Sequence, residues 1–289
     1  MKSFQELYTE IQDQTFDTSA AGLVVIKRRI NDGIRQVVRL TNGVFLDKTK
    51  TSTTDADGIM SVPVDFGKLI AIVVANSATQ NYNPQIITGR SEWNRLNASS
   101  YSSDYTSHVF IENKQLYLWP TPASTGKTVT LIYKRIVKDL IAADYTSGTV
   151  TATNNSTTIT GVGTTFTAAM VGRYIKLPDG FWYEIASYTS ATSITISGSY
   201  EGTTTAGATF TIGEMSVIPE GHEDVIIDYV LWKHYMRISD RAQANDYKQS
   251  FYDRVKLLKT DFSSWSTNVV IDDGMNSPSL NPNLFINFL

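Results

Sequence analysis

The side chains able to do acid–base or metal chemistry are few in this sequence and widely spaced. Its three histidines are His108, His222 and His234, and it has no cysteine. Thiolate-bound zinc, thiol nucleophiles and disulfides are therefore excluded together. His222-Glu223 is not followed by the second histidine that a His-Glu-x-x-His zinc site requires. We therefore expect neither a metal ion nor a cofactor.

Short acidic and glycine-containing motifs do not complete a catalytic or binding site either. Asp55-Ala56-Asp57-Gly58 is similar to the start of a calcium loop, but Val64 stands where the bidentate glutamate belongs. Gly161-Val162-Gly163 lacks the third glycine and the helix of a phosphate cradle. The pairs Glu223-Asp224 and Asp272-Asp273 are adjacent, so on a helix they point about 100° apart. No Gly-x-Ser-x-Gly elbow occurs. We predict turns at the glycine motifs and no enzymatic activity.

Basic residues gather on one predicted helix, where Arg28, Arg35 and Arg39 align along one side. Two interpretations stay open: a solvated helix face, or a face that contacts an acidic partner or lines a DNA channel. The formal charge of -3 argues against an electrostatic nucleic-acid binder. No signal peptide and no run of ~20 apolar residues is present, so we expect no membrane partner.

The C-terminal segment is apolar but has no helix or strand period. Leaving a Leu or Phe side chain in water forgoes roughly 1.5 to 3 kcal/mol. We therefore expect the segment to dock on another component. The residues expected to make this contact are Leu280, Leu284, Phe285, Ile286, Phe288 and Leu289.

Two helices are predicted near the N-terminus. Ser3 and Glu6 form a capping box, followed by an apolar face of Phe4, Leu7, Tyr8 and Ile11. Asp17, Thr18 or Ser19 can cap a second helix. Its apolar stripe consists of Leu23, Ile26, Ile30, Ile34 and Val37.

A helical hairpin is predicted after residue 217. Ile218-Pro219-Glu220 should open its first helix, with proline in the first turn. The predicted apolar face is Val225, Tyr229, Trp232 and Met236. A break near Ser239-Asp240 leads to a second helix striped by Tyr247, Phe251, Val255, Leu258 and Phe262.

Between these helices the signals are those of β-structure. Residues 59–140 contain short β-rich runs, with Glu112-Asn113-Lys114 as a hairpin loop and Trp93 in a short helix. Residues 146–213 are rich in Thr, Ser and Gly, and their apolar residues alternate, which predicts half-buried strands. Asp179-Gly180 is a hairpin turn signal.

The sequence thus predicts an α+β fold. A helical bundle built from the N- and C-terminal helices carries a β-hairpin region and an inserted small all-β barrel or sandwich. We divide the chain into an adaptor core of residues 1–145 and 214–265, a β module of residues 146–213, and an extended tail of residues 266–289.

Three stretches carry a family resemblance: the Phe4 to Leu7 helix followed by residues 26–33, residues 218–226 with the two helices after them, and the module from Gly148 to Gly213. In this organisation the chain resembles a head-to-tail adaptor, or connector, of a tailed bacteriophage. The resemblance spans most of the chain but rests on few invariant residues.

The resemblance implies a structural virion protein, made in the host cytoplasm and located at the head–tail junction. Such adaptors form a ring, usually of twelve copies, between the portal protein and the tail or its terminator or nozzle protein. Double-stranded DNA passes through non-specifically. The tail from Leu280 to Leu289 would then be the portal-docking segment.

Two other functions compete with the adaptor. The Thr-rich β segment, with Tyr174, Phe181 and Trp182 as exposed candidates, could be a glycan-binding or host-recognition module of a phage tail. A hydrolase acting on cell-wall material is a further alternative, against which the missing nucleophile and metal patterns weigh.

Overall fold

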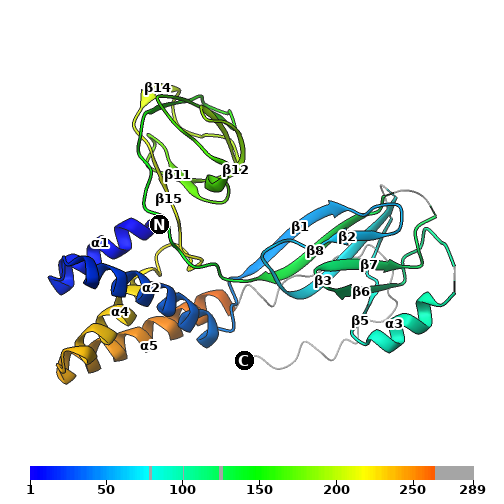
Figure 1. Cartoon of the computed structure of the whole chain (residues 1–289), viewed down its shortest axis with the longest axis horizontal. Coiled ribbons are helices and arrows are strands. Elements are labelled where there is room, and N and C mark those ends of the chain that lie inside the picture. The colour runs from blue at the N-terminus through cyan, green and yellow to red at the C-terminus, as the bar shows by residue number, and fades with distance from the viewer. Residues whose placement is uncertain (78–79, 100, 124–125, 264–289) are drawn as a thin grey trace, which may run out of the picture.

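The computed structural model describes residues 1–77, 80–99, 101–123 and 126–263, and the fold is α+β (Figure 1). Five α-helices and fifteen strands are assigned in this part of the chain. The helices are α1 (Phe4–Thr15), α2 (Ala20–Leu40), α3 (Arg90–Asn97), α4 (Asp224–Arg237) and α5 (Arg241–Ser263).

Helices α1, α2, α4 and α5 pack around one hydrophobic core. The capping box at Ser3 and Glu6 is confirmed, and Ser19 caps α2. Fully buried side chains of α1, α2, α4 and α5 include Phe4, Leu7, Ile30, Val230 and Phe251. Along α1, α2 and α5 buried apolar residues recur mainly every three or four positions, so each of these helices presents a continuous apolar face, whereas α4 is buried on more than one side.

Two four-stranded sheets form the second part of the molecule. One has the order β1-β8-β3-β4 and the other β2-β7-β6-β5. Their strands are β1 (Asp47–Thr53), β2 (Ile59–Ser61), β3 (Phe66–Ser77), β4 (Gln80–Tyr82), β5 (Gln85–Ile87), β6 (His108–Glu112), β7 (Gln115–Trp119) and β8 (Thr128–Arg135). Val74, Leu116 and Leu131 contribute to a core that joins the sheets.

Local chemistry accounts for the turns of these sheets. Asn113 and Lys114 have φ angles of 51° and 62°, which two-residue hairpin loops of the primed type require. Asp55 accepts hydrogen bonds from the backbone N–H groups of Asp57 and Ile59, so this motif is a polar turn as predicted. The Trp93 helix is confirmed as α3, and its indole stacks on Phe110.

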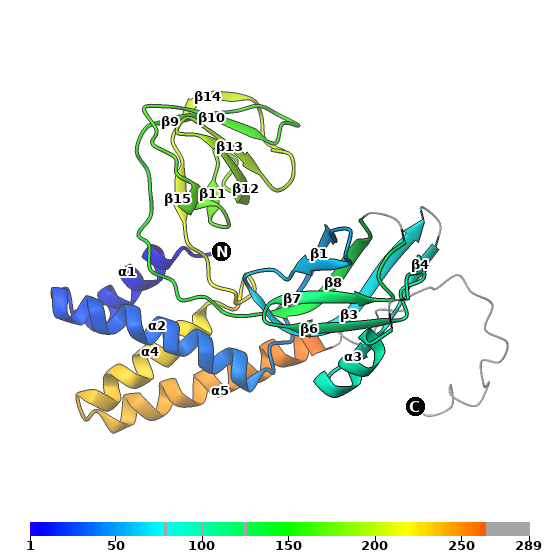
Figure 2. The ribbon, with the colours of Figure 1, turned by 45° about the vertical axis from the view of Figure 1, so that its right-hand side comes forward.

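Residues 149–213 form a seven-stranded antiparallel sheet curled into a half-barrel (Figure 2). The strands are β9 (Thr149–Ala152), β10 (Thr158–Val162), β11 (Tyr174–Lys176), β12 (Trp182–Ser190), β13 (Ser193–Ile196), β14 (Thr205–Ala208) and β15 (Thr211–Gly213), with a single 3-10 turn at Ala168–Met170. Ile159, Ile175 and Ile194 are fully buried in its own core. The predicted turn at Asp179-Gly180 connects β11 and β12, and Gly180 has a φ of 86°.

Helix α4 departs from its prediction in two ways. It begins at Asp224 rather than at Pro219, because Gly221 turns the chain at a φ of 84° just before it. Its buried face also differs from the predicted stripe. The fully buried apolar residues include Ile226, Ile227, Val230 and Leu231, whereas Met236 is 55% exposed and Tyr229 and Trp232 are half-buried. Of the predicted stripe, Val225 is buried as predicted, Tyr229 and Trp232 lie at the edge of the core, and Met236 faces outward.

Candidate interaction surfaces

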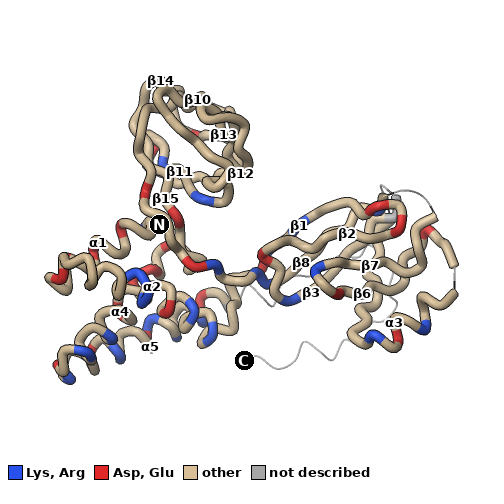
Figure 3. Tube along the Cα trace, viewed as in Figure 1, with Lys and Arg blue, Asp and Glu red and all other residues tan. Residues whose placement is uncertain are grey.

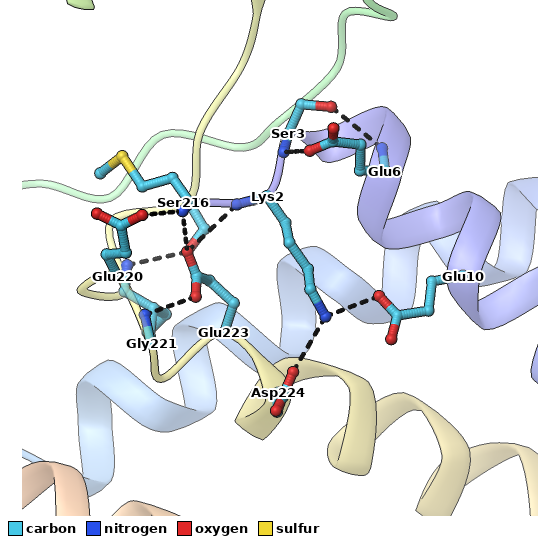
Figure 4. A network of polar contacts seen from close by, with 11 residues as sticks. Lys2, Ser3, Glu6, Glu10, Ser216, Glu220, Gly221, Glu223 and Asp224 are labelled. Atoms are coloured by element: carbon cyan, nitrogen blue, oxygen red, sulfur yellow. Dashed lines mark hydrogen bonds and ion pairs between the residues drawn. The ribbon is translucent and has the colours of Figure 1, made fainter. Parts of the chain in front are cut away.

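The N-terminus is fixed to the start of α4 by a network of charged groups (Figure 4). The Met1 ammonium group forms an ion pair with Glu220. The Lys2 ammonium lies 2.8 Å from Glu10 and 3.1 Å from Asp224. Burial alone would lower the pKa of Lys2, but the hydrogen bonds to Glu10 and Asp224 raise it overall. The network therefore joins α1 to α4 across more than two hundred residues of sequence.

Polar contacts hold the two chain segments that lead into and out of the half-barrel. The Glu214 carboxylate accepts hydrogen bonds from the backbone N–H groups of Ile141 and Ala142 at 2.6 and 2.8 Å. Tyr145 and Ile212 form an antiparallel bridge just beyond them. The two segments therefore run side by side where they leave the helices.

Asn31 connects α2 to the segment that follows β8. Its amide nitrogen donates to the Leu140 carbonyl at 3.0 Å, and its amide oxygen accepts from the Leu140 N–H at 2.9 Å. Both residues are buried. Because a buried backbone N–H or C=O is costly when unpaired, Asn31 fixes this segment on the helices.

A cavity of about 640 Å³ opens where the helices, the β1-β8-β3-β4 sheet and the half-barrel meet. Its wall is mainly apolar and includes Phe45, Ile132, Tyr174, Ile218 and Phe262. Phe262 lies at the end of α5, so the described part of the chain ends at this cavity.

The three arginines predicted as a basic face have different surroundings. All three side chains are exposed on α2. Arg35 forms ion pairs with Asp32 at 2.7 Å and with Asp139. Arg28 and Arg39 form no ion pair within the described residues. Arg35 is thus engaged within the subunit, and Arg28 and Arg39 remain the candidates for an outside contact.

Sequence reasoning missed a second basic surface, which we call the aromatic–basic face. It consists of Arg29 on α2, Tyr229, Trp232, Lys233 and Met236 on α4, and Lys248 and Tyr252 on α5. The Lys233 ammonium lies 3.7 Å from the Trp232 ring centroid, and the Lys248 ammonium lies 5.8 Å from it. Gly33 allows α2 to approach α4 here, since a Cβ on it would lie 2.9 Å from the Tyr229 ring.

The cations of the aromatic–basic face repel one another. Burial lowers the pKa of Arg29, and the nearby Arg237 and Arg28 lower it further. Burial also lowers the pKa of Lys233, with contributions from Arg29 and Lys248. In the part of the chain that the structure covers, no carboxylate forms an ion pair with Arg29, Lys233 or Lys248.

The candidate glycan-stacking residues are divided between two environments. Phe181 is 69% exposed at the β11–β12 turn, and the half-buried Trp182 carries the Lys176 ammonium at 5.5 Å from its ring. Tyr174 instead lines the cavity near Phe262. The three rings therefore do not form one exposed platform, and glycan binding stays a prediction for Phe181 and Trp182.

The predicted docking residues from Leu280 to Leu289 lie outside the described part of the chain. Among the residues described, no three His, Asp or Glu side chains gather as metal ligands would. None of the described helices combines the length and apolar composition that crossing a membrane requires.

The chain combines a four-helix unit, two four-stranded sheets and a half-barrel. A family model described as SU10 adaptor protein matches residues 2–159, which is more than half of the chain. The match runs from α1 through both four-stranded sheets into β10. The chain therefore belongs to the SU10 adaptor family of bacteriophage adaptor proteins, as the resemblance predicted. No curated protein matches the chain.

Proposed function

We propose that this protein forms a ring, of twelve copies as in the adaptors it resembles, between the portal and the tail of a phage virion. The ring extends the channel through which double-stranded DNA passes. The observation that carries the proposal is the family match over α1, α2 and the two four-stranded sheets. The four helices act as one bundle that forms the body of the ring.

The apolar segment from Leu280 to Leu289 is the portal-docking element of this proposal. It follows α5, and its Leu, Ile and Phe side chains supply apolar surface without the period of a helix or strand. Twelve such tails in one ring raise the effective concentration of each, so that weak single contacts add to a stable complex.

Deletion of residues 280–289 tests the docking role. The shortened protein should keep its fold and lose cosedimentation with the portal protein. The matched control replaces Asn281, Asn283 and Asn287 with Ser, which leaves the apolar side chains unchanged. Unimpaired portal binding by the deletion variant would refute the role of the tail. Electron microscopy of wild-type protein mixed with portal should show a stacked ring, and monomers alone would contradict the ring itself.

The proposed division into an adaptor core (1–145 with 214–265), a β module (146–213) and a tail (266–289) is testable separately. The module has its own buried core, and its two connecting segments pair at Tyr145 and Ile212. Residues 146–213 expressed alone should give the circular dichroism spectrum of a β protein with a cooperative thermal transition. Loss of that transition would mean that the half-barrel depends on the core.

A further inference from the structure

The aromatic–basic face has the composition of a contact surface rather than of a solvated helix face. Apolar and aromatic side chains stand beside cations on three helices, and the cations form no ion pair within the described residues. Tyr, Trp, Met and Arg are enriched at protein interfaces and Lys is depleted there. The two lysines of this face hold their ammonium groups over the Trp232 ring, and the aromatic rings and Met236 supply the interface composition. A partner for this face should therefore offer carboxylates together with an apolar group.

Helix α1 of the same chain has a surface with carboxylates and an apolar ring, which we call the acidic edge. Glu6, Glu10 and Asp13 recur at helical spacing on the side of α1 opposite its buried residues. Glu6 accepts a hydrogen bond from the Ser3 N–H and Glu10 pairs with the Lys2 ammonium, whereas Asp13 is exposed and forms no ion pair within the described residues. Phe16 follows directly and is 92% exposed. Figure 3 shows blue segments on α2 and α5, which contrast with the acidic α1. The acidic edge thus offers the aromatic–basic face the exposed carboxylate of Asp13 and the exposed ring of Phe16.

The two surfaces lie on different sides of the helices. Figures 1 and 2 both place α1 and α5 on opposite sides of α2 and α4. A contact between two different surfaces of identical subunits is heterologous, and repeating it produces a closed ring or an open filament instead of a dimer. Charge complementarity would also favour contact between the acidic edge and the aromatic–basic face over contact between two identical surfaces, because like charges that face each other destabilise a complex.

We propose that the acidic edge of one copy of this protein docks on the aromatic–basic face of the next copy. The inference rests on the proposed ring and names the surfaces that join its subunits. Double-stranded DNA is the competing anionic ligand for the same cations. The apolar Met236 and the half-buried rings beside the cations favour a protein surface over phosphate groups.

Site-directed disulfide formation tests the contact directly, because the chain has no cysteine of its own. Two single-cysteine variants, Thr9→Cys on α1 and Met236→Cys on α4, are purified with different tags, mixed and oxidised. Neither chain can form an internal disulfide. The mixed disulfide should form at least about tenfold faster than with the control pair Thr9→Cys and Val64→Cys, whose Val64 position is 94% exposed in a loop outside both surfaces.

Charge reversal then separates docking from chance collisions. Lys233→Glu in the Met236→Cys chain should remove the rate advantage, and Asp13→Lys in the Thr9→Cys chain should restore it when both are present. Raising the salt concentration should weaken the wild-type contact, since partly exposed charges are screened. A rate equal to the control pair would overturn the proposal. The proposal would also be overturned if Lys233→Glu abolished duplex DNA binding, measured by fluorescence anisotropy, and left the cross-linking rate unchanged.

The ring itself is measured in parallel on the wild-type protein by mass photometry with portal present. Rings without the mixed disulfide would refute these surfaces and leave the proposed function intact. Monomers under every condition, with a stable wild-type fold, would refute the proposed function as well.

Discussion

Replacing Asn31 with alanine should loosen the attachment of the segment after β8 to the helices. The substitution removes both hydrogen bonds to Leu140 and leaves a backbone N–H and a C=O group buried without those partners. At about 1 to 3 kcal/mol for each unsatisfied group, partly relieved by water, we expect a loss of about 2 to 4 kcal/mol in the free energy of opening this segment.

Hydrogen exchange measured by mass spectrometry reports this opening locally. The Leu140 amide loses its acceptor in the variant, and its exchange, followed in a peptide covering residues 137–145, should become about 30- to 700-fold faster. The amides of Ile141 and Ala142 keep their hydrogen bonds to Glu214. Gln36→Ala on the same helix is the control and should change exchange by less than about threefold, because surface substitutions cost within about 0.5 kcal/mol. Unchanged protection in Asn31→Ala would refute the reasoning that these two bonds hold the segment.

Three further predictions follow from other parts of the molecule. Gly33→Ala should destabilise the protein by about 1 to 3 kcal/mol in urea denaturation, because the new Cβ would lie 2.9 Å from the Tyr229 ring; a neutral effect would mean that the ring moves freely. Burial, with Arg237 nearby, lowers the pKa of His234, so the unfolded chain gains a proton below about pH 6.5 that the folded chain does not. Stability should therefore fall from pH 7 to pH 5, and His234→Gln should reduce that slope. A glycan array with folded protein should give a signal that Phe181→Ala abolishes if the β11–β12 turn binds sugars; a flat array would exclude that alternative.

Local rules predicted the elements whose apolar residues follow one clear period. Helices α1, α2 and α5 and the strands β11, β12, β13 and β15 of the half-barrel have this property, and the Asn113-Lys114 hairpin was predicted from its turn residues. Strand β1 was missed because its sequence, Asp47 to Thr53, is polar and its side chains are mostly exposed. Only its pairing with β8, more than seventy residues later, makes it a strand.

Helix α4 shows a different limit of sequence reasoning. It has apolar residues on nearly every side, so a period of 3.6 selects no single buried face. Packing against three other helices decides which side is covered, and that information is spread over the whole chain. The surface made by Trp232 and Lys233 could therefore be recognised only from the structure, which shows which side of α4 is buried.

For the candidate site residues too, the sequence predicts local properties but not contacts between distant segments. Exposure of Arg28, Arg35 and Arg39 follows from their helix positions, but the ion pair of Arg35 with Asp139 depends on a residue 104 positions away. No local pattern relates those two side chains. The sequence could therefore propose a basic face, and only the three-dimensional arrangement separates the engaged arginine from the two others.

The paired segments at Tyr145 and Ile212 make the half-barrel a replaceable part. Its first and last residues leave the remainder of the protein as neighbours, so a foreign domain with closely spaced ends could be spliced between them without stretching the chain. A fluorescent reporter inserted there would mark each subunit while leaving the Glu214 hydrogen bonds in place.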